Sequence, residues 1–313
     1  MVNWDGSTAL VSINVEKVSG TLMRTNDTHH TNGEDAPLFQ TLRVGLDGGV
    51  LNVTIDAPPM NLLGPELVRD LVWLIQWAEP DERIQVLVFT SADPDYFIAH
   101  VDVTRIAEYR AEAARLTGEA SIAAMFHDLS ASRLITIAQI EGRVRGAGDE
   151  FVLSCDMRFG ARETAVFAQF EAAFGQLPGG GATQYLTRLL GRGRALEVLL
   201  SADDFSADLA EQYGWINRSL PGDEIGDFVQ RLAHRIASFP AAGHTAIKQR
   251  VNHISLAPLE DFRFDSDRFG QSASTPETQR LFAEALRSGF QQRETERDLA
   301  RWLETLTTRS QNP

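Results

Sequence analysis

The sequence predicts an α/β core followed by a helical C-terminal region. Strand-like and helix-like segments alternate from Phe39 to about Pro221, and the pattern beyond Pro221 is helical to about Leu306. Alternation of this kind is typical of an α/β domain. The residues before Phe39 are polar and weakly patterned, which indicates an N-terminal arm of low intrinsic order.

Three regions follow from this division. They are the polar N-terminal arm (1–36), the core domain (37–255) and a C-terminal helical region (256–313) that forms a lid or a small separate domain.

Local signals place the elements of the core in order. An Asp-Gly-Gly turn between two alternating runs predicts a hairpin, and Pro65 marks the start of a helix. Short apolar runs bounded by polar turns predict buried strands, and residues 92–100 are expected to form a loop. The expected strands lie at 42–56 (the hairpin), 84–91, 134–142 and 157–169. The expected helices lie at 65–79, 103–129, 146–156, 177–191, 193–202 and 206–214.

Composition excludes several classes of protein. No apolar run reaches the roughly 20 residues that a membrane-spanning helix needs, and the N-terminus lacks the pattern of a secretory signal or transit peptide. Cys155 is the only cysteine, so no intrachain disulfide can form and a cytoplasmic location is expected. The formal charge is −14, which disfavours binding to nucleic acid or to an anionic membrane.

The stretch EGRVRGAGDEFVLSCD (141–156) brings glycines and two acids to the edge of an apolar run. A helix that begins near Gly146 leaves unpaired backbone N–H groups at its N-terminus, and small residues let a ligand oxygen approach them. Asp149 and Glu150 would repel a phosphate, and Phe151 replaces the third glycine of a dinucleotide motif. A transient oxyanion beside a carboxylate fits better, although acids and glycines at a helix start are also ordinary turn chemistry.

Further segments, in one consistent order over about residues 39–255, carry a family resemblance. DAPPMNLLGPEL is similar to a P-x-x-N-A-L segment, and YFIAHVDVTRI is similar to an F-x-A-G-x-D-[IL] loop. The run from Ser154 to Leu200 and the segment ADLAEQYGWINRSLP continue the order. Together they resemble the crotonase (enoyl-CoA hydratase/isomerase) superfamily.

The resemblance implies a crotonase-type fold of repeated ββα units, a homotrimer or dimer of trimers, and a role for the C-terminal region in trimerisation. It also implies an acyl-CoA substrate, with coenzyme A as part of the substrate and no separate cofactor. Superfamily members hold the thioester oxygen with two backbone N–H groups as it becomes an enolate, and these donors fall on Ala99 and Ala147. The neighbouring residues expected at the substrate are Leu62, Ile98, Gly146 and Gly148.

Two glutamates match the positions that the superfamily's hydratases use. Glu150 lies three residues after the second donor, and Glu171 stands in FAQFE where the family has F-G-x-P-E. Hydration of a conjugated double bond needs a base for water, an acid for Cα and stabilisation of the enolate. We expect Glu150 to orient and deprotonate the water and Glu171 to exchange a proton with Cα. The resemblance adds the backbone N–H of Gly179 as a ligand of that water.

Several positions depart from the family pattern. His100 replaces a glycine, and its side chain either faces solvent, caps the next helix at Asp102, or adds a donor or base near the thioester. Asp149 is interpreted as an acid at a helix start. The C-terminal segment GFQQR offers Arg293, and no lysine, to the phosphates of CoA. The remaining histidines show no metal-ligand spacing, so no metal is expected.

Three functions remain open at this point. The first is an enoyl-CoA hydratase-type lyase that uses both glutamates. The second is another acyl-CoA reaction of the superfamily, a hydrolase, isomerase or C–C lyase, in which His100 takes part. The third is a non-catalytic assembly or binding subunit on the same scaffold.

Overall fold

The computed structural model describes residues 37–310, with the side chains described as far as Leu306. The polar arm predicted for residues 1–36 lies outside the described residues. All described residues belong to one compact unit. The boundary expected at residue 255 stays a prediction.

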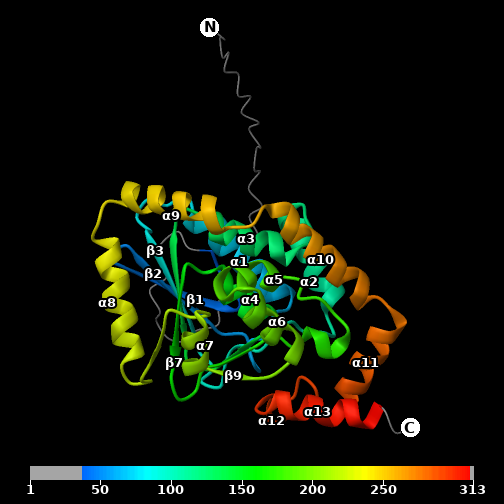
Figure 1. The fold of residues 1–313 in the computed structure, drawn as a ribbon. Helices are drawn as coiled ribbons and strands as arrows, with labels where there is room; N and C mark the ends of the chain where they lie inside the picture. The colour runs from blue at the N-terminus through cyan, green and yellow to red at the C-terminus, as the bar shows by residue number, and fades with distance from the viewer. Residues whose placement is uncertain (1–36, 311–313) are drawn as a thin grey trace, which may run out of the picture. The chain divides into compact units, whose positions relative to one another are not determined.

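A six-stranded sheet forms the larger of two layers of strands (Figure 1). Its strands, in spatial order, are β1 (Leu42–Asp47), β2 (Val50–Ile55), β3 (Val86–Ser91), β5 (Ile135–Ile140), β7 (Met157–Ala161) and β10 (Arg218–Leu220). β1 and β2 are antiparallel, and the other neighbours are parallel. Gly48 and Gly49 form the hairpin turn with φ of 53° and 87°, so the predicted hairpin is confirmed.

A second sheet has four short strands, and two of them lead directly into Ala99 and into α4. Its strands, in spatial order, are β4 (Tyr96–Ile98), β6 (Arg143–Arg145), β8 (Val166–Ala168) and β9 (Phe205–Ser206). The chain passes from the large sheet to the small one and then into a helix or turn three times, as β3–β4–α2, β5–β6–α4 and β7–β8–η1. This repetition is the ββα arrangement that was expected.

The helices fall into two groups. Those of the core are α1 (Pro65–Ala78), α2 (Ile106–Thr117), α3 (Ile122–Ala131), α4 (Ala147–Ser154), the 3-10 turn η1 (Glu171–Phe174), α5 (Ala182–Leu190), α6 (Arg192–Ser201) and α7 (Ala207–Tyr213). The helices that follow β10 are α8 (Ile225–Ala237), α9 (Ala241–Ser255), α10 (Leu259–Ala273), α11 (Pro276–Arg287), α12 (Arg293–Glu296) and α13 (Leu299–Ser310), of which α10 to α13 make up the C-terminal region.

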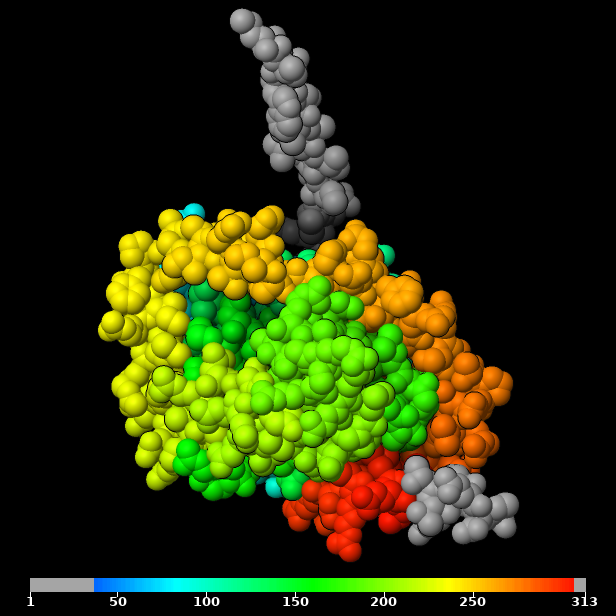
Figure 2. Space-filling view, in the orientation of Figure 1, coloured from blue at the N-terminus to red at the C-terminus, as the bar shows by residue number. Residues whose placement is uncertain are grey.

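The C-terminal helices run around the border of the core in the view of Figure 1. The space-filling view shows α5 to α7 in the middle of this face, with α9 to α11 along its border and α12 and α13 at its lower edge (Figure 2). Between residues 37 and 310, no helix has the length and apolar character needed to cross a membrane.

The main apolar core lies between the large sheet and α1 to α7. Phe89, Phe97 and Phe126 each pack against Phe151 of α4, with ring centroids 5.0, 6.5 and 5.8 Å away. Phe151 therefore anchors α4 by its buried face. This anchoring fixes where the N-terminus of α4 points.

Two element predictions were wrong in detail. The single helix expected at 103–129 is two helices, because Gly118 ends α2 with φ of 83° and the Ser121 side chain begins α3 by accepting the N–H of Ala124 at 3.2 Å. The loop expected at 92–100 contains β4, whose three residues are all buried and so lack the alternation that signals a strand.

Candidate active site

The site is built where two parallel strands of the small sheet end. β4 pairs with β6, with Ile98 opposite Val144. Ala99 directly follows β4, and Ala147 opens α4 just after β6. Parallel neighbours end at the same edge of a sheet, so the two segments predicted to carry the oxyanion donors lie side by side.

The two glycines that flank Ala147 permit this close approach. A Cβ on Gly148 would lie 2.1 Å from the carbonyl oxygen of Ile98. Gly146 has φ of 50°, and a Cβ there would lie 2.8 Å from Oε1 of Glu171. Bare backbone is therefore required at both positions, which the motif alone could not establish.

The predicted oxyanion donors differ in their surroundings. Ala147 is the first residue of α4, where helical geometry offers its N–H no acceptor four residues earlier. The N–H of Ala99, in contrast, donates to the carbonyl oxygen of Met60 at 3.2 Å. A thioester oxygen would have to share or replace that long bond. The roles of both residues in the reaction stay predictions.

We expect Gly148→Ala to destabilise the protein and to reduce its activity. The new methyl group would meet the backbone of Ile98, which cannot rotate away, so α4 and the end of β4 must separate. Overpacking of this kind costs about 1–3 kcal/mol of the free energy of unfolding. Thermal and urea unfolding measure the loss. Gly193→Ala on α6, where a Cβ meets nothing within 4 Å, is the matched control, and equal stability of the two variants would contradict the expectation.

Glu150 projects from the first turn of α4 and is buried, with 1 % of its surface exposed. Its Oε1 accepts the backbone N–H groups of Gly180 and Ala182, at 2.7 and 3.0 Å. A Cβ on Gly180 would lie 2.5 Å from Oε2, so the glycine turn before α5 encloses the carboxyl group. One carboxylate oxygen is thus fixed by the main chain.

The pKa of Glu150 is raised to about 7. Burial is the main cause; the N–H groups of Ala182 and Gly180 act to lower the pKa, and the negative charge of Asp265 raises it further. A carboxyl group with a pKa near neutrality is suited to accept and return a proton at physiological pH.

Glu171, the second predicted glutamate, begins the turn η1 and is also buried. Burial raises its pKa well above the usual range, and the charge of Glu150 raises it further. Within residues 37–310 its Oε2 has no hydrogen-bond partner. A protonated carboxyl with one oxygen unused is suited to give a proton to a bound molecule.

Asp149 is more than an acid at a helix start. It is fully buried, and its two oxygens accept from Trp215 Nε1 at 3.0 Å and Gln169 Nε2 at 2.8 Å. Burial raises its pKa well above the usual range, against the effect of these two donors. Asp149 therefore ties α4 to the small sheet and to the segment after α7.

Helix α10 covers the glycine turn that holds Glu150. A Cβ on Gly179 would lie 2.6 Å from Cγ of Phe269, and one on Gly181 would lie 2.4 Å from Cε1 of Phe262. Asp265 accepts hydrogen bonds from the side chains of Thr183 and Gln184, the latter at 3.0 Å. Gly179 is therefore packed against α10, and the N–H groups that Glu150 accepts belong to Gly180 and Ala182. Water binding by the N–H of Gly179 stays a prediction.

Asp265→Asn should shift the acid limb of the pH–rate profile to lower pH. Asp265 is buried and its charge disfavours ionisation of Glu150, so a neutral amide should lower the pKa of Glu150 and leave it ionised in more acidic solution. The profile of kcat/KM measures the shift. Asp267→Asn changes an exposed acid of the same helix and should leave the profile in place; an unchanged limb in Asp265→Asn would contradict the assignment.

The expectation that His100 faces solvent or caps the next helix was wrong. Its side chain is fully buried and its ring stacks on Phe290, with centroids 4.8 Å apart and an interplanar angle of 6°. Nδ1 lies 2.6 Å from the carbonyl oxygen of Val101, and Nε2 lies 3.1 Å from Oε1 of Glu296. Helix α12 packs against the residues at and just after β4. The local sequence around His100 gives no sign of this long-range contact.

Arg293, expected at the phosphates of CoA, is held by other groups. Its guanidinium is paired with Asp93 and Asp95, with the latter at 2.8 Å, and lies over the ring of Tyr96. A phosphate would have to draw Arg293 away from two carboxylates. Leu62, expected at the substrate, lines a cleft of about 470 Å³ that also includes Asp102 and Arg105.

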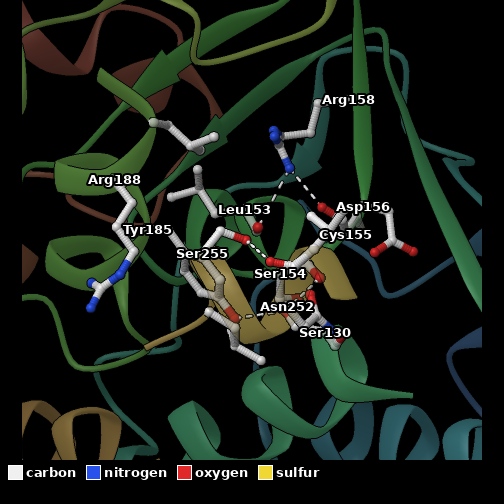
Figure 3. Close-up of a pocket in the computed structure, with 13 residues that line it drawn as sticks. Ser130, Leu153, Ser154, Cys155, Asp156, Arg158, Tyr185, Arg188, Asn252 and Ser255 are labelled. Atoms are coloured by element: carbon white, nitrogen blue, oxygen red, sulfur yellow. Dashed lines mark hydrogen bonds between the residues drawn. The ribbon is translucent and has the colours of Figure 1, made fainter. Parts of the chain in front are cut away.

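A second cleft, of about 220 Å³, lies at the opposite end of α4 from Glu150 (Figure 3). Leu153, Ser154 and Cys155 line it, and Tyr185 bonds with Ser130 at 2.8 Å on its wall. The buried guanidinium of Arg158 points at the end of α4 and donates to the carbonyl oxygen of Cys155 at 2.6 Å. None of the predicted catalytic residues lines this cleft.

Fold and site together define an α/β protein with the buried carboxyl groups of Glu150 and Glu171 beside the buried N-terminus of α4. Comparison with known proteins agrees. The family model for enoyl-CoA hydratase/isomerase matches residues 45–293. The short-chain-enoyl-CoA hydratase of Clostridium acetobutylicum is 29 % identical over 231 residues, which cover 73 % of this chain and 88 % of the relative.

Two further relatives extend the comparison. The crotonyl-CoA hydratase of Syntrophomonas wolfei is 31 % identical over 217 residues, covering 69 % of this chain and 83 % of the relative. The crystal structure of a candidate enoyl-CoA hydratase from Streptomyces avermitilis is 48 % identical, with a TM-score of 0.83 and coverage of 85 % of this chain and 97 % of that chain. The chain belongs to the enoyl-CoA hydratase/isomerase family, a family of enzymes, and its relatives support a hydratase-like function.

Proposed function

We propose that the protein is an enoyl-CoA hydratase, which adds water reversibly to the double bond of a 2-enoyl-CoA thioester. One observation carries the proposal: the buried carboxyl groups of Glu150, on the first turn of α4, and of Glu171, beside Gly146, lie at one helix N-terminus and have raised pKa values, and no side chain of the described residues bonds to them. The Glu171 carboxyl lies beside Gly146, directly before the helix turn that carries Glu150. Relatives named as hydratases support the same reaction.

The geometry suggests how the work is divided. Glu150, with Oε1 fixed by Gly180 and Ala182, has Oε2 available to take a proton from water. The water oxygen then bonds to Cβ, and the electron pair of the double bond moves toward the thioester carbonyl. The N–H of Ala147 stabilises the resulting enolate oxygen, with the N–H of Ala99 as a shared second donor. Protonated Glu171 gives its proton to Cα, which completes the addition.

The surroundings of His100 favour hydration over the alternative that relies on this residue. Both ring nitrogens lie at hydrogen-bond distance from acceptor oxygens. Neither nitrogen has a free lone pair while both bonds are made, so the ring has no proton-accepting role in this arrangement. A hydrolase, isomerase or C–C lyase that uses His100 as a base would require both contacts to break.

Exposed apolar side chains on α9 support the expected assembly into a homotrimer or a dimer of trimers. Ile247, Val251 and Ile254 lie on one face of this helix and are 66, 53 and 74 % exposed. Contiguous apolar surface of this kind is typical of a subunit interface. Sedimentation equilibrium of the purified chain would measure the mass of the assembly.

Turnover of a panel of thioesters tests the proposed reaction. Crotonyl-CoA should lose its conjugated absorbance and yield a 3-hydroxyacyl-CoA, identified by mass spectrometry, without release of free CoA. The double variant Glu150→Gln/Glu171→Gln gives the background rate. Turnover of the wild type no faster than this background, or free CoA as the product, would refute the proposal.

A further inference from the structure

The two backbone segments expected to hold the thioester oxygen are tied to each other through one buried residue of the C-terminal region, Glu296. This residue ends α12 and is fully buried. Its side chain contacts His100, the residue after Ala99. Its backbone carbonyl oxygen accepts from Nη1 of Arg145, two residues before Ala147, at 2.8 Å.

Each end of this bridge is fixed by further contacts. Arg145 is fully buried and makes a bidentate pair with Asp204, with both N···O distances at 2.7 Å. The ring of His100 is held between Phe290, stacked at 4.8 Å, and the edge of Phe170 at 5.3 Å. Bidentate and buried contacts of this kind leave little freedom to the groups that make them.

A second contact from the same segment supports the loop after Ala99. Gln291 donates from Nε2 to Asp102 at 3.0 Å, and its Oε1 accepts the N–H of Val103 at 2.9 Å. The N–H of Gln291 donates in turn to Oε1 of Glu296 at 3.0 Å. The segment 290–296 therefore contacts the loop after β4 at three residues, His100, Asp102 and Val103.

The hydrogen bonds of the bridge hold the ring of His100 at both nitrogens. The carbonyl oxygen of Val101 can only accept, so Nδ1 donates to it, while Nε2 bonds to the carboxyl group of Glu296. Burial acts to raise the pKa of Glu296, yet that pKa is lowered, chiefly by the charge of His100 and its hydrogen bond. The pair is a buried side-chain contact, and removing one partner leaves the other buried without it, which is costly.

We propose that the Glu296–His100 pair, together with the Arg145 contact to the backbone of Glu296, is a clamp that positions the N–H groups of Ala99 and Ala147 for the thioester oxygen. This inference rests on the proposed function. His100 and Glu296 are positioning residues, because they act on the oxyanion segments and not on the substrate. The clamp also explains why a bulky, polar histidine side chain is accommodated next to Ala99.

Kinetics of Glu296→Gln, His100→Gln and the double variant test the clamp. Misplaced donors should lower kcat for crotonyl-CoA about 10–100-fold, with KM changed less than about threefold, because ground-state binding uses the rest of the substrate. The double variant should be no slower than the slower single variant, since both changes break one contact. Glu294→Gln on the same helix, 88 % exposed, is the matched control and should retain wild-type kcat.

A readout without turnover separates the clamp from the reaction. Bound 2,4-hexadienoyl-CoA should absorb at longer wavelength in the wild type, because the oxyanion donors polarise its carbonyl group, and the shift should shrink in the clamp variants at saturating ligand. If the absorbance shift depends on the clamp but the wild type hydrates no enoyl-CoA, the proposed function is refuted and the clamp is not. Wild-type kcat and an unchanged shift in folded Glu296→Gln and His100→Gln would overturn the clamp alone, as would additive losses in the double variant.

Discussion

Glu150→Gln is expected to lower kcat for crotonyl-CoA hydration about 10²–10⁴-fold, the range that a positioned general base contributes. The amide oxygen of Gln can still accept the N–H groups of Gly180 and Ala182, so the glycine turn should keep its place. What is lost is the ability to take a proton from water. Stopped-flow or steady-state absorbance measurements give the rate.

The stability of Glu150→Gln should not fall with its activity. A buried carboxylate is unfavourable above its pKa of about 7, so the neutral amide should leave Tm at pH 8 unchanged or higher. An inactive variant of wild-type stability would show that the loss is chemical. Glu163→Gln, an exposed glutamate, is the control, and a Glu150→Gln variant that hydrates at the control's rate would eliminate Glu150 as the base.

The second large effect is expected for Glu171→Gln, which should also lower kcat by about 10²–10⁴-fold. The pKa of Glu171 is raised by burial and by the charge of Glu150, which favours its protonated form. An amide of the same shape fills the space against Gly146 but has no acidic proton to give to Cα. Hydration should therefore stop after attack of the water.

Isotope incorporation distinguishes this role from a structural one. In deuterated water the wild type should place one deuterium at Cα of the product, which proton NMR detects. Glu171→Gln should show a matching loss of hydration and of Cα exchange while it still binds the thioester. Exchange at the wild-type rate in this variant would assign the Cα proton to another group.

Much of the fold was predictable because its signals are local. The turn at Gly48 and Gly49, Pro65 at the start of α1, and the apolar runs of β3 and β5 each depend on a few neighbouring residues. The glycines around Ala147 were also visible as a motif. Their necessity was not, because it depends on Ile98, which lies about fifty positions away and meets Gly148 only in the folded chain.

The missed parts of the site share one physical origin, which is long-range contact. Helix α10 brings the charge of Asp265 close enough to affect Glu150, and α12 brings Glu296 into contact with His100. Neither residue has a local pattern that sets it apart from other acids of an acidic chain. For His100 the sequence left open a side chain facing solvent, a cap at Asp102, or a donor or base near the thioester. Only the fold shows the stacked ring of Phe290 and the carboxyl group of Glu296 that it contacts.

The packing of α10 on the glycine turn links proton binding to the position of a helix. With α10 in place, Glu150 is buried and its pKa is raised to about 7, in part by the charge of Asp265. Without α10 the carboxyl would lose that charge and some of its burial, and its pKa would fall. Linkage is reciprocal, so a proton on Glu150 must favour the seated helix and its loss must favour release. If Glu150 exchanges a proton with water as proposed, each such exchange also changes how strongly α10 is held against the core.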